Sequence, residues 1–185
     1  MNPEGVTLQS LHRLRRSLGT TTLAERVRHR ATALARRNRS AGARILAMRD
    51  ALIEALYRDT SPKGWFNAWC DGSARPDGPA SIGALVLDPD SGGVVAQISR
   101  AADHITPFEA EVAALEAVLE VAVKRDFRHM RVHTDCRALV ELWRAHRADP
   151  RLARVRSLAH RLKRLELRTV PRLHNQPAHR LARES

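Results

Sequence analysis

Apolar residues recur at two different periods along the 185-residue chain, and the period changes near residue 60. Before that point they repeat every three or four positions, as on one face of an amphipathic helix. The repeats cover residues 8–18, 23–34 and 45–56. Threonines at 20–22 precede the second repeat, and we expect one of them to cap its helix. Residues 1–60 are therefore predicted to form two or three short helices.

Beyond residue 60 the pattern alternates between strands and helices. The expected strands are 65–74, 82–87, 94–99, 130–134 and 166–173. The expected helices are 107–123, 137–146, 150–165 and 176–183. Thr106 and Glu109 stand three positions apart where the first helix begins, which is the spacing of a capping box. This order predicts an α/β fold with a mixed sheet flanked by helices.

A Pro- and Gly-containing segment, residues 60–64, separates the two patterns. We therefore divide the chain into a helical extension, residues 1–60, and a domain, residues 61–185. About 100–200 residues per domain is typical, so the length allows this arrangement. Two cysteines exclude a disulfide scaffold and a four-cysteine zinc site. No apolar stretch reaches the ~18 residues of a membrane span, and we expect a cytoplasmic protein of undetermined oligomeric state.

The charge is strongly basic: 32 Lys and Arg against 20 Asp and Glu give a net charge of +12. Such a balance predicts attraction to a polyanion, most simply nucleic acid. An arginine bias of the source genome is the alternative, since only three of the basic residues are lysine. Residues 1–60 contribute +7 of the net charge. They form either an arm that binds the nucleic-acid backbone or an appendage for packing or self-association.

Three carboxylates stand where a sheet of this kind could bring them together. Asp71 and Asp135 end the first and fourth expected strands, and Glu111 lies in the first turns of the helix at 107–123. Carboxylates held close together repel one another and stay ionised beside a cation. Their oxygen ligands suit Mg²⁺ or Mn²⁺, and two such ions about 4 Å apart can promote phosphodiester hydrolysis. Spacing alone is weak support, because acidic residues are common at strand ends and on helices.

Four motifs, in order over about residues 64–185, resemble those of ribonuclease H type 1 and of reverse-transcriptase-like ribonuclease H domains. They are Asp71-Gly72-Ser73 with the strand that follows it, Ala110-Glu111-Val112, Thr134-Asp135-Cys136, and Val170-Pro171-Arg172 with Asn175, Ala178 and His179. The resemblance implies a five-stranded sheet of order 3-2-1-4-5. It also implies an endonuclease that hydrolyses the RNA strand of RNA–DNA hybrids by a two-metal mechanism.

Carried over by motif, Asp71, Glu111 and Asp135 take the family's first three catalytic and metal-binding positions. His179 stands where the family usually has a fourth Asp, which removes one negative charge from the site. The implied cofactor is Mg²⁺, while a nitrogen ligand would tilt the preference toward Mn²⁺. His179 is thus either a fourth ligand or a drifted surface residue in a weakened enzyme.

Contacts to the hybrid are expected from Asn67, Ser73 and Arg75 around the first strand, and from Arg172 and Asn175 in the last motif. The family's Gly-Asn-Pro-Gly turn is replaced here by residues 75–79, which puts the Arg75 contact in doubt. For Asn175, holding the turn into the last helix is the stronger interpretation. The arginine-rich helix at 150–165 either binds phosphate or presents a solvated face.

Two further interpretations compete with the hybrid nuclease. The first is a catalytically weakened ribonuclease H fold that only binds nucleic acid, which the substitution at His179 favours and the three carboxylates oppose. The second is a related nuclease with another nucleic-acid substrate. Metal-dependent turnover distinguishes the first, and competition between substrates distinguishes the second.

Overall fold

The computed structural model describes residues 19–38, 40–58, 60–74, 79–103 and 106–183. The contacts divide the chain into two units, Met1–Thr60 and Ser61–Ser185. None of the helices in these described ranges is long and apolar enough to cross a membrane. The helix expected at residues 8–18 lies outside them.

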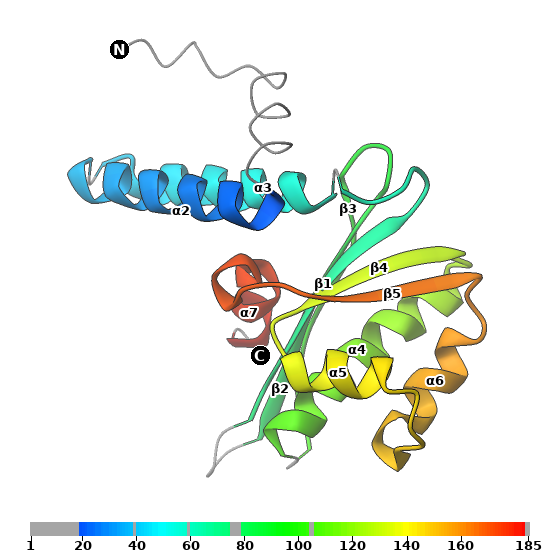
Figure 1. Ribbon diagram of the computed structural model, residues 1–185. Helices are drawn as coiled ribbons and strands as arrows, with labels where there is room; N and C mark the ends of the chain where they lie inside the picture. The colour runs from blue at the N-terminus through cyan, green and yellow to red at the C-terminus, as the bar shows by residue number, and fades with distance from the viewer. Residues whose placement is uncertain (1–18, 39, 59, 75–78, 104–105, 184–185) are drawn as a thin grey trace. The chain divides into compact units, whose positions relative to one another are not determined.

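The first unit is a pair of helices, α2 (Thr20–Arg37) and α3 (Gly42–Arg58), that pack against each other (Figure 1). The predicted threonine cap is wrong, because Thr20 is already helical and Gly19 occupies the cap with φ 78°, a value that suits glycine. Between the helices, Oδ1 of Asn38 accepts hydrogen bonds from the Ala41 N–H and the Ser40 hydroxyl. The Asn38 side chain thus fixes the turn between the two helices, whose conformation the helical pattern did not predict.

The second unit is built on five strands: β1 (Phe66–Ser73), β2 (Ala80–Leu87), β3 (Val94–Ala102), β4 (His129–Thr134) and β5 (Arg164–Thr169). Their order in the sheet is β3-β2-β1-β4-β5. The first three strands pair antiparallel, and β4 and β5 continue the sheet in parallel from β1. The predicted mixed sheet and its implied order are both confirmed.

Helices connect the parallel strands. Between β3 and β4 runs α4 (Pro107–Lys124), and between β4 and β5 run α5 (Arg137–Arg144), the short η2 (Pro150–Leu152) and α6 (Ala153–Ala159). The predicted capping box is present, because the Thr106 hydroxyl accepts from the Glu109 N–H and the Glu109 carboxylate accepts from the Thr106 N–H. The box fixes where α4 begins, and with it the position of the helix's first turns.

Alternation along β1 assigns the two faces of the sheet. Ala68 and Cys70 belong to the core shared with α4, whereas Asp71 points to the opposite face, which carries α7 (Gln176–Arg183) (Figure 1). Gly83 pairs with Asp71 across β1 and β2. A Cβ at Gly83 would lie 2.2 Å from the carbonyl oxygen of Ala178, so only glycine lets α7 sit directly on β2.

Two expected boundaries are corrected near the end of the chain. The helix predicted at 150–165 ends at Ala159, and β5 begins at Arg164, because the N–H groups of Lys163 and Arg164 bond to the Arg128 carbonyl beside β4. The strand predicted at 166–173 ends at Thr169, shortly before Pro171, which has no N–H for a strand ladder. Residues Arg172–His174 form a 3₁₀ turn, η3, that leads into α7.

Replacing Gly83 with alanine tests the close approach of α7 to the sheet. The added methyl group overlaps backbone atoms of α7, so we expect the free energy of unfolding to fall by about 1–3 kcal/mol or more. Chemical denaturation of Gly83→Ala measures it. The control is Gly93→Ala, whose new Cβ meets only the Ser91 side chain, at 3.2 Å. Equal stability of the two variants would contradict the packing argument.

Candidate metal centre

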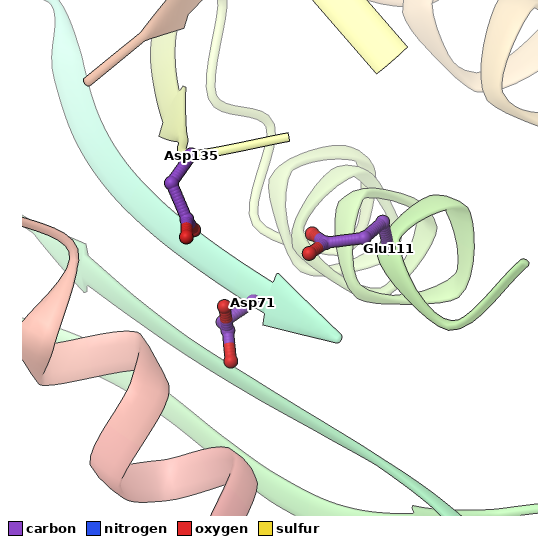
Figure 2. Close-up of side chains that lie close together, drawn as sticks. All are labelled: Asp71, Glu111 and Asp135. Carbon is purple, nitrogen blue, oxygen red and sulfur yellow. The ribbon is translucent and has the colours of Figure 1, made fainter. Parts of the chain in front are cut away.

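The three predicted carboxylates converge at one edge of the sheet. Asp71 comes from β1, Asp135 directly follows β4, and Glu111 lies on α4; Figure 2 shows their carboxylate groups pointing toward one another. One oxygen from each lies within 4.8 Å of the others. Among the described residues, this is the one group of three or more acidic, His or Cys side chains close enough to share a metal ion.

Gly72 is what allows Glu111 to reach the cluster. A Cβ on Gly72 would lie 2.2 Å from the backbone carbon of Ala110 and 2.3 Å from the nitrogen of Glu111. The first turns of α4 therefore rest directly on the backbone of β1. The Gly72 N–H also donates a hydrogen bond to the Glu111 carboxylate. The glycine that follows Asp71 in the sequence thus has a packing function as well as a place in a motif.

Burial and mutual repulsion perturb the acids of the cluster. Burial raises the pKa of Glu111 to about 8, and the charges of Asp71 and Asp135 contribute to the shift. The pKa of Asp71, whose side chain is almost fully buried, is raised mainly by burial, with a further contribution from Asp135. The hydrogen bond to His179 offsets part of this shift. Negative charge is therefore held here at a free-energy cost that a cation would relieve.

The donor set fits a hard divalent cation. Three carboxylates with converging oxygens are ligands that suit Mg²⁺ or Mn²⁺. Cys70 adjoins the cluster in sequence, but burial raises the pKa of its thiol well above the usual value, and the nearby carboxylates add to the shift. It therefore stays a neutral thiol within the core, and its orientation away from Asp71 agrees with the alternation of the strand.

Asn175 holds the turn into α7, as the sequence favoured, and it also bonds to the carboxylate cluster. It lies between η3 and α7 and is fully buried, so the expected contact with a nucleic acid is wrong. Its Nδ2 donates to Oδ1 of Asp135 at 2.6 Å and to the carbonyl of Cys70 at 2.9 Å. Its main-chain carbonyl accepts the His179 N–H in the first turn of α7. The side chain of Asn175 thus joins the ends of β1 and β4, and its backbone joins them to the start of α7.

His179 and Arg172 lie at the border of the cluster. Nδ1 of His179 is 3.0 Å from Oδ2 of Asp71, so the residue in the family's fourth position contacts the first carboxylate directly. The Arg172 guanidinium lies 3.8 Å from the second oxygen of Asp135, and 68% of its side chain is exposed. Metal binding by His179 and nucleic-acid binding by Arg172 stay predictions, and the geometry gives both residues access to the site.

The residues predicted around the first strand divide into three cases. Ser73 lies at the end of β1, two positions beyond Asp71 and on the same face. Arg75 lies outside the described residues. Asn67 is corrected: it is only 1% exposed, its Oδ1 accepts from the Ser61 hydroxyl and its Nδ2 donates to the Trp65 carbonyl. A side chain enclosed in this way has no surface for a hybrid.

The arginines near α6 are also engaged within the domain. Arg154 forms ion pairs with Glu116 and Glu120 of α4. Arg151 pairs with Asp149 and lies over the Phe108 ring. Contacts of this kind attach η2 and α6 to their neighbours. The structure therefore gives Arg151 and Arg154 a packing role, while Arg161 and Arg164 stay exposed and both earlier interpretations stay open for them.

Removing the charge of Glu111 tests the electrostatic cost of the cluster. In the folded protein the pKa of Glu111 is about 8, against an ordinary value of 4.5, so the stability of metal-free protein falls as the pH rises from 4.5 to 8. Glu111→Gln removes this dependence. In EDTA we expect the variant to melt several degrees above the native protein at pH 8.5, with the difference largely gone near pH 4.5.

The matched control is Glu141→Gln, which removes an exposed carboxylate on α5. A gain in melting temperature of the same size at both pH values, or an equal gain in the control, would contradict a buried repulsive cluster. Adding Mg²⁺ at pH 8.5 is expected to stabilise the native protein more than Glu111→Gln.

Asn175→Ala tests the amide that positions Asp135. Loss of both hydrogen bonds frees the carboxylate to rotate, and partners of metal ligands typically contribute about 10–100-fold to metal affinity. We expect Mn²⁺ titration calorimetry to show a loss of that size. Gln176→Ala, at the half-buried neighbouring position, is the control. Unchanged affinity in a folded Asn175→Ala protein would show that the amide does not position the site.

Comparisons with known proteins agree with this architecture. A family model described as reverse transcriptase-like matches residues 70–185. The N-terminal RNase H domain of a Mycobacterium tuberculosis protein, solved as a fusion with maltose-binding protein, is 31% identical with a TM-score of 0.60, covering 65% of this chain and 97% of that one. A search of curated proteins gave no match.

Two type 1 RNases H are also similar in structure. The protein from the halophilic archaeon Halobacterium salinarum is 30% identical, with a TM-score of 0.58 over 64% of this chain and 95% of that one. The compost-derived LC11-RNase H1, solved with an RNA/DNA hybrid, is 23% identical, with a TM-score of 0.58 over 65% and 95%. The ribonuclease hydrolase class implied by the motifs is confirmed, and the chain belongs to the reverse transcriptase-like family of ribonuclease H domains.

Proposed function

We propose that this protein is a metal-dependent endonuclease that hydrolyses the RNA strand of RNA–DNA hybrids. The observation that carries the proposal is the cluster of Asp71, Glu111 and Asp135 at the sheet edge of a ribonuclease H fold. A fold neighbour solved in complex with an RNA/DNA hybrid supports the choice of substrate. Residues 61–185 are proposed to carry the activity.

Asp71, Glu111 and Asp135 are proposed to hold two divalent ions, Mg²⁺ or Mn²⁺. Such ions, when bound, supply Lewis-acid activation of water and stabilise charge on the leaving oxygen. His179 would be a fourth ligand, and its Nε2 is the ring nitrogen that does not already face Asp71. A nitrogen donor favours Mn²⁺ relative to a fourth carboxylate.

Around the cluster, the chain's own residues orient the acids and receive the substrate. Asn175 fixes the rotation of the Asp135 carboxylate, and His179 fixes that of Asp71. Arg172 is proposed to bind a phosphate next to the scissile one, because its guanidinium is exposed at the border of the site. Ser73, and Arg75 beyond it, are proposed to contact the hybrid past the open end of β1.

One observation favours a second candidate, a module that binds nucleic acid without cutting it. The His179 ring lies against Asp71 at 3.0 Å, where the family pattern has a carboxylate. The site therefore carries less negative charge with which to attract a second ion. In this candidate the domain binds hybrids and turns them over slowly or not at all.

Cleavage of a labelled RNA–DNA hybrid in Mg²⁺ and in Mn²⁺ tests the proposal. The native chain is expected to cut only the RNA strand, with duplex DNA and double-stranded RNA left intact. Asp135→Asn, which removes a ligand, is expected to lower the rate at least about 100-fold, more than the loss of an outer partner. His179→Asp is expected to retain activity and to shift the preference toward Mg²⁺.

Two results would sink the enzyme proposal. If neither metal supports cleavage by the native chain or by His179→Asp, while both bind the hybrid tightly, the binding module is the better description. Equal cleavage by the native chain and Asp135→Asn would show that the observed nuclease does not use this cluster.

A further inference from the structure

A row of arginines runs along one face of α2. Arg26, Arg30 and Arg37 are exposed and stand four and seven positions apart, which places them on the same side of the helix, with Arg36 next to the last of them. At 1.5 Å per residue the row is about 16 Å long. We call Arg26, Arg30 and Arg37 the α2 row.

The hairpin formed by α2 and α3 does not neutralise the positive charge of this row. In the part of the chain that the structure describes, no hydrogen bond or ion pair involves the side chains of the α2 row. Other arginines of the hairpin differ: Arg49 pairs with Asp50, and Arg28 contacts His29. The row's positive charge is therefore available to a partner outside the hairpin.

Helix stability does not explain the row either. Arg26 and Arg30 are like charges four positions apart, an arrangement that destabilises a helix by a few tenths of a kcal/mol. Arg37 lies in the last turn, where a cation is favoured by the helix dipole, but the other two gain nothing from it. The charges of Arg26 and Arg30 therefore add no electrostatic stability to α2.

Three exposed arginines of the second unit are, by contrast, already engaged. The Arg125 guanidinium donates to the Val95 carbonyl, Arg128 pairs with Asp126, and Arg154 pairs with acids of α4. These three residues resemble the α2 row in charge and exposure but differ in having partners. They make a matched control set.

We propose that the α2 row binds the phosphate backbone of double-helical nucleic acid, without regard to sequence. A duplex carries one charge per about 1.7 Å of its axis, so a row about 16 Å long can face roughly ten phosphate charges. Such a contact raises the local concentration of duplex around the whole chain, as a second module does in a bivalent binder. The site lies outside the carboxylate cluster and requires no hydrolysis.

The test uses the full chain in EDTA, where cleavage is absent, and follows fluorescence anisotropy of labelled hybrid and duplex DNA over a salt series. The triple variant R26A/R30A/R37A is expected to bind both at least about 10-fold more weakly at low salt. The slope of log K against log salt should become shallower by about 2–3, since each lost phosphate contact removes about 0.9. R26K/R30K/R37K keeps the charges and should stay close to the native chain.

The control R125A/R128A/R154A removes the same charge from arginines that already have partners, and its affinity should stay within about 3-fold of the native chain. Equal losses in both alanine triples would overturn the proposal, because net charge alone would then explain binding. Circular dichroism checks that the helices are retained. If the alanine triple is unfolded, failure of the lysine triple to bind like the native chain overturns the proposal instead.

Other partners give different results. The proposal is overturned if the native chain binds anionic phospholipid vesicles through the α2 row and shows no row-dependent binding of duplex. It is also overturned if light scattering shows that the row's only effect is on self-association. This proposal can hold even if the protein proves not to be a nuclease. Asp135→Asn is expected to bind duplex as the native chain does, and the R26A/R30A/R37A substitutions are expected to weaken that binding as well. Normal hydrolysis with row-independent binding would sink this inference alone.

Discussion

The repulsion among three carboxylates held within 4.8 Å of one another is the constraint on which the rest of the site depends. Burial, together with this repulsion, raises the pKa of Glu111 to about 8 and also raises the pKa of Asp71. A protein segment free to move would separate these charges. The surrounding structure therefore supplies rigid backbone contacts on one side and a fixed amide on the other, and the energy stored between the carboxylates becomes affinity for a cation.

Two glycines, which have no Cβ, allow much of this rigid packing. Gly72 lets α4 rest on β1, and Gly83 lets α7 rest on β2, with no room for a Cβ at either place. These two contacts lie on opposite faces of the sheet and bring Glu111 and His179 toward Asp71 from different directions. Asn175 completes the arrangement by bonding the end of β1 to the side chain that follows β4. Close contacts between backbone segments thus position the acids, and their carboxylate groups are available to bind a ligand.

Local patterns were enough to predict the strands, the capped start of α4 and the three acids, because each of these depends on neighbours in sequence. The resemblance to a family supplied the strand order. The bonds of Asn175 to Cys70 and Asp135 could not be predicted, since these partners are 105 and 40 positions away and only the tertiary fold joins them. The same reason explains the error at Asn67, which is buried, and the unforeseen pairing of Arg154 with α4. The end of β5 was misplaced although Pro171, two residues beyond it, is a local signal for the end of a strand.

The long sequence separations within the centre have a consequence for how the protein acquires activity. His179 and Asp71, in contact in the folded state, are 108 positions apart, and Asn175 and Asp135 are 40 apart. No single hairpin or helix pair contains all the residues of the centre. In a partly folded chain these acids are therefore present but not held close together. Closing loops of this length costs chain entropy, which contacts elsewhere in the domain must offset. The carboxylate centre is therefore complete only when the domain as a whole has folded.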